Sequence, residues 1–431
     1  MDGHVASPPI AISPPAARER PNLGDLLRAG LFLGVIGFGG GLSVLANIQA
    51  LVVEKKRWLT DREFANTVTV SQMLPGGASA NALAYIGLRF AGWRGAVAGY
   101  VGFVLPGFIS VLALAWAYVR FGTTPNVETL LGGFNAAVVG IIVSITLKMV
   151  RTSVSRLWQM GVAALALLFS AVGSAPPGEI VLAAIAVGLA VDLGTKRARL
   201  ASVRRRRKTD VEPPVALPEE GQPLEPPAQP PSGGGSLSSP WPLAIVGLLA
   251  AVHLTGIDAE LLRLGLTFFR TGLGAYGGGF AIVPHLKSVI DTRGWLTDRQ
   301  FADAVAIGKL TPGPVLLLST FIGYLHHGVL GAIVATVCIL AAPFLLVVLA
   351  GAALDRLRSR RFVRAALRGL TPAVLGLMAA AAIALGDQLS GEAEIGIAGA
   401  VALTLTRFPV NPAMMLLLGG VTRLLLRMVR L

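Results

Sequence analysis

The chain has 431 residues, of which 54% are apolar and only 14% are charged. Soluble domains average about 25% charged residues, so the composition excludes an ordinary soluble protein. A membrane-spanning helix needs roughly 20 mostly apolar residues, and the apolar content allows on the order of a dozen such helices. We therefore predict an all-α polytopic membrane protein.

Charge, cysteine and histidine content exclude further classes of function. The formal charge is +14, but much of it lies between apolar runs, where membrane topology explains it better than nucleic-acid binding. Cys338 is the single cysteine, and the five histidines form no H-x-x-x-H pair. No acid-rich or histidine-rich cluster marks a membrane-embedded enzyme, so we expect no catalytic residue, no metal and no cofactor.

The order of apolar runs divides the chain into two halves. Residues 1–24 form a proline-containing tail that we predict to be disordered, and residues 25–195 contain six apolar runs. Residues 196–240 combine a basic run with a Pro/Glu/Gly/Ser stretch, which is the composition of a linker. Seven more runs follow in residues 241–431. About 12–13 transmembrane segments are therefore expected.

The second half repeats motifs of the first in the same order. Residues 58–65 read WLTDREFA and residues 295–302 read WLTDRQFA, identical at seven of eight positions. Other matched segments are FGGG at 38–41 with YGGG at 276–279, and MLPGG at 73–77 with LTPGP at 310–314. A duplicated unit of about 120–150 residues is too long for a solenoid and is typical of a transporter.

The placement of lysine and arginine predicts that the two halves are inverted in the membrane. The basic linker should be cytoplasmic, and six preceding runs place the N-terminus in the cytoplasm as well. The extra run at 241–256 then starts the second half from the opposite side. The basic segment 55–57 falls outside in this arrangement, which disagrees with the rule.

The repeated WLTDREFA motif predicts a helix start. Thr60 with Glu63, and Thr297 with Gln300, have the spacing of a capping box. A helix beginning at the membrane surface accounts for the motif, and a direct role in gating is the alternative. We therefore interpret the motif as a structural helix start rather than as part of a gate.

The repeated Pro-Gly segments are stronger candidates for function. Proline and glycine break a helix inside an apolar stretch, and broken helices at membrane depth occur where protein or a wet cavity surrounds them. The exposed N–H groups of the following helix attract an anion. Breaks at matched positions of two halves are typical of a transporter's binding site. A kink that serves only packing is the alternative.

Lys309 lies in an apolar stretch beside the second break. An intramembrane lysine is by default a functional hypothesis, and the alternative is that it extends to the membrane surface. Few acidic residues lie inside the predicted spans, and Asp303 and Glu128 are the nearest candidates for a proton site. An anion therefore suits the predicted site better than a cation.

The run from Tyr276 to Thr336 and the matching first-half motifs resemble the chromate ion transporters in their long, two-half form. The similarity covers roughly residues 25–150 and 262–385. The resemblance implies a secondary transporter that exports chromate, or sulfate, from the cytoplasm across the inner membrane and gives chromate resistance. The family's glycine-rich and Pro-Gly motifs match Gly39, Gly40, Pro75, Gly76, Gly277, Gly278, Pro312, Gly313 and Pro314.

Four positions depart from the family pattern. Gly41 and Gly77 stand where the family has proline, the polar or acidic residue usual after the first break is Asn81 here, and Lys309 stands where glutamine is expected. All lie near the proposed site, so another oxyanion, or an anion channel, remains an alternative. The full set of predicted substrate-binding residues is Gly39, Gly40, Gln72, Pro75, Gly76, Asn81, Gly277, Gly278, Lys309, Thr311, Pro312, Gly313, Pro314 and Ser319. The expected partners are the oxyanion and the lipid bilayer, without nucleic acid, and homo-oligomerisation is left open.

Overall fold

The computed structural model describes residues 20–38, 41–172, 175–209, 258–357, 361–389 and 391–429. All regular structure in these ranges is helical. The first half contains α1 (Leu23–Ile36), α2 (Gly41–Gln49), the π-helix η1 (Ala50–Lys55), α3 (Asp61–Met73), α4 (Ala78–Phe121), α5 (Pro125–Ser153), α6 (Leu157–Ala171) and α7 (Pro177–Thr209).

The second half repeats this order of elements. It contains α9 (Ala259–Leu273), the 3-10 helix η2 (Gly277–Ile282), α10 (Val283–Arg293), α11 (Asp298–Leu310), the 3-10 helix η3 (Val315–Leu317), α12 (Leu318–Leu357), α13 (Arg361–Gly386), α14 (Glu392–Arg407) and α15 (Pro412–Val429). Each half thus has a short first helix, an interrupted second one, a half-helix, a very long helix and three more helices. The predicted all-α fold of two related halves is confirmed.

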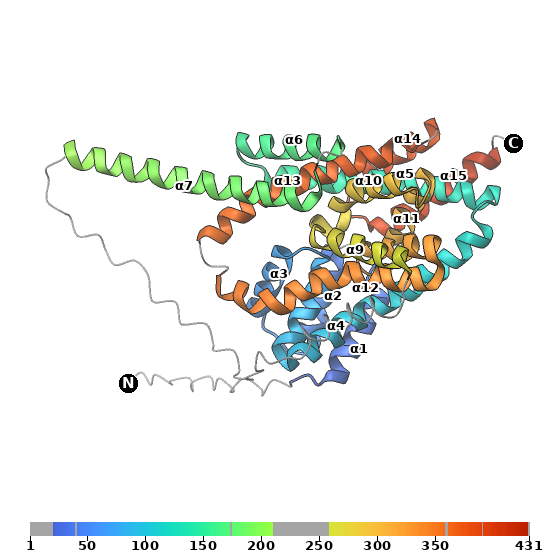
Figure 1. Ribbon diagram of the computed structural model, residues 1–431, viewed down its shortest axis with the longest axis horizontal. Helices are drawn as coiled ribbons and strands as arrows, with labels where there is room; N and C mark the ends of the chain where they lie inside the picture. The colour runs from blue at the N-terminus through green and yellow to red at the C-terminus, as the bar shows by residue number, and fades with distance from the viewer. Residues whose placement is uncertain are drawn as a thin grey trace, which may run out of the picture.

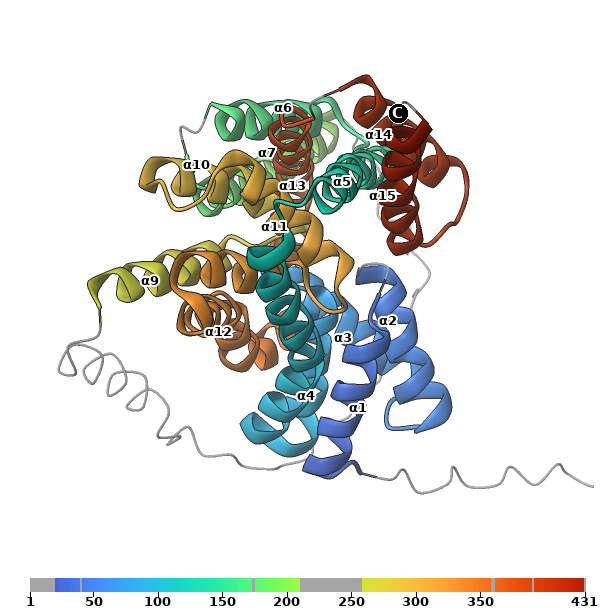
Figure 2. The ribbon, with the colours of Figure 1, turned by 90° about the vertical axis from the view of Figure 1, so that its right-hand side faces the viewer.

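The helices form two layers, each built from both halves (Figures 1 and 2). One layer contains α1 to α4 together with α9 and α12, and the other contains α5 to α7 together with α13 to α15. The half-helix α11 lies between the layers. The site described below is therefore enclosed by elements from distant parts of the chain.

The halves exchange helices in the second layer. Helix α13 packs against α6 and α7 of the first half, while α5 packs against α14 and α15 of the second. Glycines allow these close approaches: a Cβ at Gly140 would lie 2.4 Å from the Ala398 carbonyl oxygen, and one at Gly376 would lie 2.2 Å from that of Ala163. The contacts are reciprocal, as a two-fold axis between the halves requires.

The two longest helices each reverse direction at a glycine. Backbone angles leave the helical region at Gly92 (φ 62°, ψ −153°) in α4 and at Gly328 (φ 59°, ψ −148°) in α12. The two arms of the α4 hairpin pack closely on each other. A Cβ on Gly87, before the turn, would lie 2.1 Å from the carbonyl oxygen of Gly95, after it. Positive φ favours glycine, so the matched glycines fix the same hairpin in both halves.

Six helices in the described ranges are long and apolar enough to cross a membrane: α4, α5, α7, α12, α13 and α15. The prediction of 12–13 segments counted apolar runs, and the structure distributes these runs differently. Helices α4 and α12 each contain parts of two predicted runs, while α1, α6, α9 and α14 have only 14, 15, 15 and 16 residues. The predicted run at 241–256 lies outside the described residues.

Helix α7 extends beyond the rest of the molecule in Figure 1. It continues to Thr209, so the basic run that the sequence placed at the start of a linker is the end of this helix. The remainder of the predicted linker, and most of the predicted N-terminal tail, lie outside the described residues.

Both predicted capping boxes are present. The Thr60 N–H donates to the Glu63 carboxylate (2.9 Å), and the Glu63 N–H donates to the Thr60 hydroxyl (3.3 Å). Thr297 and Gln300 form the same pair at 2.9 and 3.3 Å. The two motifs therefore start the half-helices α3 and α11, which lead directly to the Pro-Gly segments.

Candidate functional site

The two Pro-Gly segments interrupt the helices as predicted. Residues 74–77 separate α3 from α4, and residues 311–314 separate α11 from η3 and α12. Gly76 has a φ of +100° and Gly313 a φ of +108°, conformations that L side chains rarely adopt. The matched angles show that both halves build the same break.

Polar side chains close the C-terminal ends of the half-helices. The Asn81 amide donates to the carbonyl oxygens of Pro75 (2.8 Å) and Ser71 (3.3 Å). In the second half, the Thr311 hydroxyl donates to the carbonyl oxygen of Ile307 (3.1 Å). Both residues were predicted to bind substrate, and in this structure their donors are already used by the backbone.

The breaks are held by backbone hydrogen bonds between the halves. The Gly76 N–H donates to the Ala275 carbonyl oxygen (2.7 Å), and the Gly313 N–H donates to the Gly37 carbonyl oxygen (3.2 Å). Gly37 follows α1, and Ala275 follows α9 at the matching point of the repeat. Each half therefore positions the break of the other half.

Proline-containing helices support the breaks from the opposite half. A Cβ at Gly76 would lie 2.6 Å from the Pro343 side chain in α12, and one at Gly107 in α4 would lie 2.2 Å from the Pro312 carbonyl oxygen. The breaks also contact each other, because a Cβ at Gly77 would lie 3.1 Å from the Pro314 side chain.

The helices that leave the breaks begin without side-chain caps. Gly77 precedes α4 and Pro314 precedes η3, and neither supplies a side-chain hydrogen bond to the first amides. Uncapped N–H groups carry the positive end of the helix dipole, equivalent to about half a charge. Since the two N-termini meet where Gly77 contacts Pro314, the arrangement favours an anion.

Lys309 lies in the last turn of α11, directly before the second break. Its ammonium group is 5.3 Å from the ring centroid of Phe280 in η2, a cation–π contact. The side chain is partly buried, and no acidic partner pairs with it among the described residues. Its charge is therefore available to an anion.

The other predicted residues occupy different surroundings. Ser319 is fully buried in α12, and its hydroxyl has no hydrogen-bond partner among the described residues. Gln72, the repeat counterpart of Lys309, is exposed. Gly277 and Gly278 belong to η2, and Gly39 and Gly40 lie outside the described residues.

A second polar cluster surrounds Asp303, of which the sequence indicated only the acid itself. The Asp303 carboxylate is 1% exposed and accepts hydrogen bonds from the Tyr118 hydroxyl (2.9 Å) and the Asn135 amide (2.8 Å). Asp303 belongs to α11, whereas its partners belong to α4 and α5. Arg299, one turn earlier in α11, pairs with Glu128 of α5.

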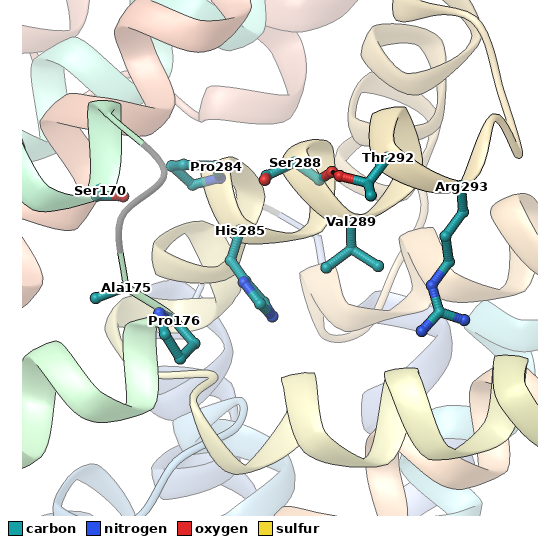
Figure 3. A pocket seen from close by; sticks show the side chains of 9 residues that line it. All are labelled: Ser170, Ala175, Pro176, Pro284, His285, Ser288, Val289, Thr292 and Arg293. Carbon is teal, nitrogen blue, oxygen red and sulfur yellow. Dashed lines mark hydrogen bonds between the residues drawn. The ribbon is translucent and has the colours of Figure 1, made fainter.

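We next compared the breaks with possible metal ligands and with the cavity that the described residues form. In the described ranges, no group of three or more His, Cys, Asp or Glu residues could hold a metal ion. A cavity of about 340 Å³ lies between α10 and the α6–α7 connection (Figure 3). It is lined by Ser170, Ala175, Pro176, Pro284, His285, Ser288, Val289, Thr292 and Arg293, none of which belongs to a break.

Two interlocked helical halves with paired broken helices define a polytopic membrane transporter. The family model described as chromate transporter matches residues 24–190 and 262–424, and the chain belongs to that family.

Relatives match most of the chain. A probable chromate transport protein of Synechococcus elongatus is 29% identical over 384 residues, which is 89% of each chain. A chromate transport protein of Cupriavidus metallidurans is 32% identical over 83% of this chain and 81% of its own. A shorter relative, an uncharacterized transporter of Bacillus subtilis, is 25% identical over 166 residues, which is 36% of this chain and 91% of its own. No solved structure matches.

Proposed function

We propose that the protein is a secondary transporter that exports chromate, or a related oxyanion such as sulfate, across the inner membrane and thereby gives chromate resistance. The names of the relatives support a transport function, and their printed substrate, chromate, is the first candidate for this chain. The observation that carries the proposal is the contact between two uncapped helix N-termini beside an unpaired lysine in the described part of the chain.

The proposed ligands of the oxyanion are the first amides of α4 and of η3, which continues into α12, together with the Lys309 ammonium and the Ser319 hydroxyl. A desolvated divalent anion needs both charge and hydrogen-bond donors, and these groups provide both. Asn81 and Thr311 are less suited, since their donors already close the half-helices. Pro75, Gly76, Pro312, Gly313 and Pro314 shape the backbone that presents the amides.

The replacement of the expected glutamine by Lys309 favours a substrate with high negative charge. Gln72 keeps the neutral side chain at the matching position of the first half, so the two breaks are not electrostatically equal. We propose that the oxyanion binds closer to the second break. Sulfate and chromate share charge and tetrahedral shape, so this site alone does not separate them.

Flux measurements in proteoliposomes test the function. Purified protein should move chromate, and radiolabelled sulfate as competitor or substrate, into vesicles against a concentration gradient when an ion gradient is imposed. A channel would give only downhill flux. Absence of both chromate and sulfate flux, with protein shown to be folded and inserted, would reject the proposed substrates.

A further inference from the structure

We propose that Asp303 binds the proton whose movement drives oxyanion export. The proposal rests on the proposed function and adds the coupling ion and its site. Asp303 is a buried acid in a half-helix that also carries Lys309, six residues further along. Buried ionisable groups at membrane depth are typical of proton pathways.

The matching half-helix of the first half carries no acid at this position. Asn66 occupies the position of Asp303 in α3, just as Gln72 occupies that of Lys309. Beyond their first turns, α3 carries neutral amides where α11 carries an acid and a base. One half-helix of the pair therefore bears both charges, which links the proton to the oxyanion.

The surroundings of Asp303 accommodate both protonation states. In this structure the Asp303 carboxylate accepts hydrogen bonds from the Tyr118 hydroxyl and the Asn135 amide nitrogen. The Asn135 amide oxygen is buried and has no partner in the described structure. Rotation of this amide would present an acceptor to a protonated carboxyl group, since asparagine offers a donor and an acceptor on one planar group. Both neighbours offer donors to the carboxylate, an arrangement that suits a proton better than a coordinated metal cation.

Other charged groups near Asp303 are already paired. Arg299 of α11 pairs with Glu128 of α5, and Tyr118 is the titratable group that α4 presents. In α15, which also packs against α11, Arg423 pairs with Glu394. Further paired groups on adjoining elements are Lys287 of α10 with Asp298, and Arg427 with the carbonyl oxygen of Pro125.

The proton is linked to a movement of α11. In this structure α11 packs against both α5 and α12, whereas its counterpart α3 packs mainly against α4 and α12. The ionised Asp303 fastens α11 to the first half through two charge-assisted hydrogen bonds. Protonation removes the charge, and neutral hydrogen bonds are roughly half as strong. A proton therefore weakens the attachment of α11, with Lys309 and the second break, to the first half.

Proteoliposomes with Asp303→Asn test the proposal. The variant copies the chain's own Asn66, so we expect a normal fold and normal chromate exchange at equal pH on both sides. Accumulation of chromate driven by a pH gradient should fall at least tenfold. Asp298→Asn, which removes an exposed acid from the same helix, should retain both activities. Wild-type accumulation in Asp303→Asn would overturn the proposal.

A second variant decides the outcome if Asp303→Asn loses exchange as well. Tyr118→Phe removes one donor to the carboxylate, so the proton binds more tightly and the midpoint of the transport–pH profile should rise by about one unit. An unchanged profile would overturn the proposal. Chromate exchange by the wild type tests the proposed substrate separately, because it needs no pH gradient.

Discussion

A methyl group at Gly107 tests the contact between α4 and the second break. A Cβ there would lie 2.2 Å from the Pro312 carbonyl oxygen and 2.6 Å from the Leu317 side chain. Ordinary contact begins at 3.4 Å, so the carbonyl group must withdraw by roughly 1 Å. Such overpacking costs about 1–3 kcal/mol, whereas alanine in a helix gains up to about 1 kcal/mol over glycine. The expected net loss is therefore about 0–2 kcal/mol, toward the upper end because two atoms lie closer than 3.0 Å to the added Cβ.

Thermal unfolding in detergent and chromate flux in proteoliposomes measure the effect. Gly107→Ala should lower the unfolding midpoint and reduce flux, because the Pro312 carbonyl group cannot move without disturbing the bond from Gly313 to Gly37. Gly161→Ala is the matched control: no atom lies within 4 Å of a Cβ at this helical position. The reasoning fails if Gly107→Ala equals the wild type in both measurements.

Three further predictions concern the site and the topology. In competition measurements, Lys309→Gln should weaken chromate binding at least tenfold or change the preference between chromate and sulfate. The control Lys148→Gln, at an exposed lysine, should change neither. Unchanged affinity and selectivity in Lys309→Gln would show that the charge is incidental. Cysteines at exposed Thr60 and Thr297, in a cysteine-free background, should react with impermeant reagents from opposite faces of the membrane, and labelling from one face would reject inverted halves. Asn81→Ala leaves two carbonyl oxygens without their donor, so stability should fall by about 1–3 kcal/mol, while substrate affinity of the folded protein stays the same; a selective loss of affinity would return Asn81 to the binding site.

Local signals in the sequence predicted the elements around the site. The capping boxes depend on residues three positions apart, and the breaks depend on Pro-Gly pairs within apolar runs. Both could be located from the repeat alone. The same local reasoning counted apolar runs, but it did not reveal that α4 and α12 turn back at Gly92 and Gly328 and continue as hairpins.

Contacts between distant residues could not be predicted in this way. Asp303 lies 185 residues from Tyr118 and 168 from Asn135, so no sequence pattern joins the three. Asn81 was interpreted as a substrate ligand because it is polar and follows a break. In this structure its amide closes α3, a role that depends on the turn bringing Asn81 back to Pro75.

The contact between the breaks limits how an oxyanion can be transported. Gly77 and Pro314 lie so close that no oxyanion fits between them in this conformation. The substrate must therefore bind beside the contact, near Lys309, or the breaks must separate. Because Gly76 is bonded to Ala275 and Gly313 to Gly37, separation in one half loosens a bond to the other half. The two breaks should consequently move together, with α11 carrying the charges on which the substrate and the proton act.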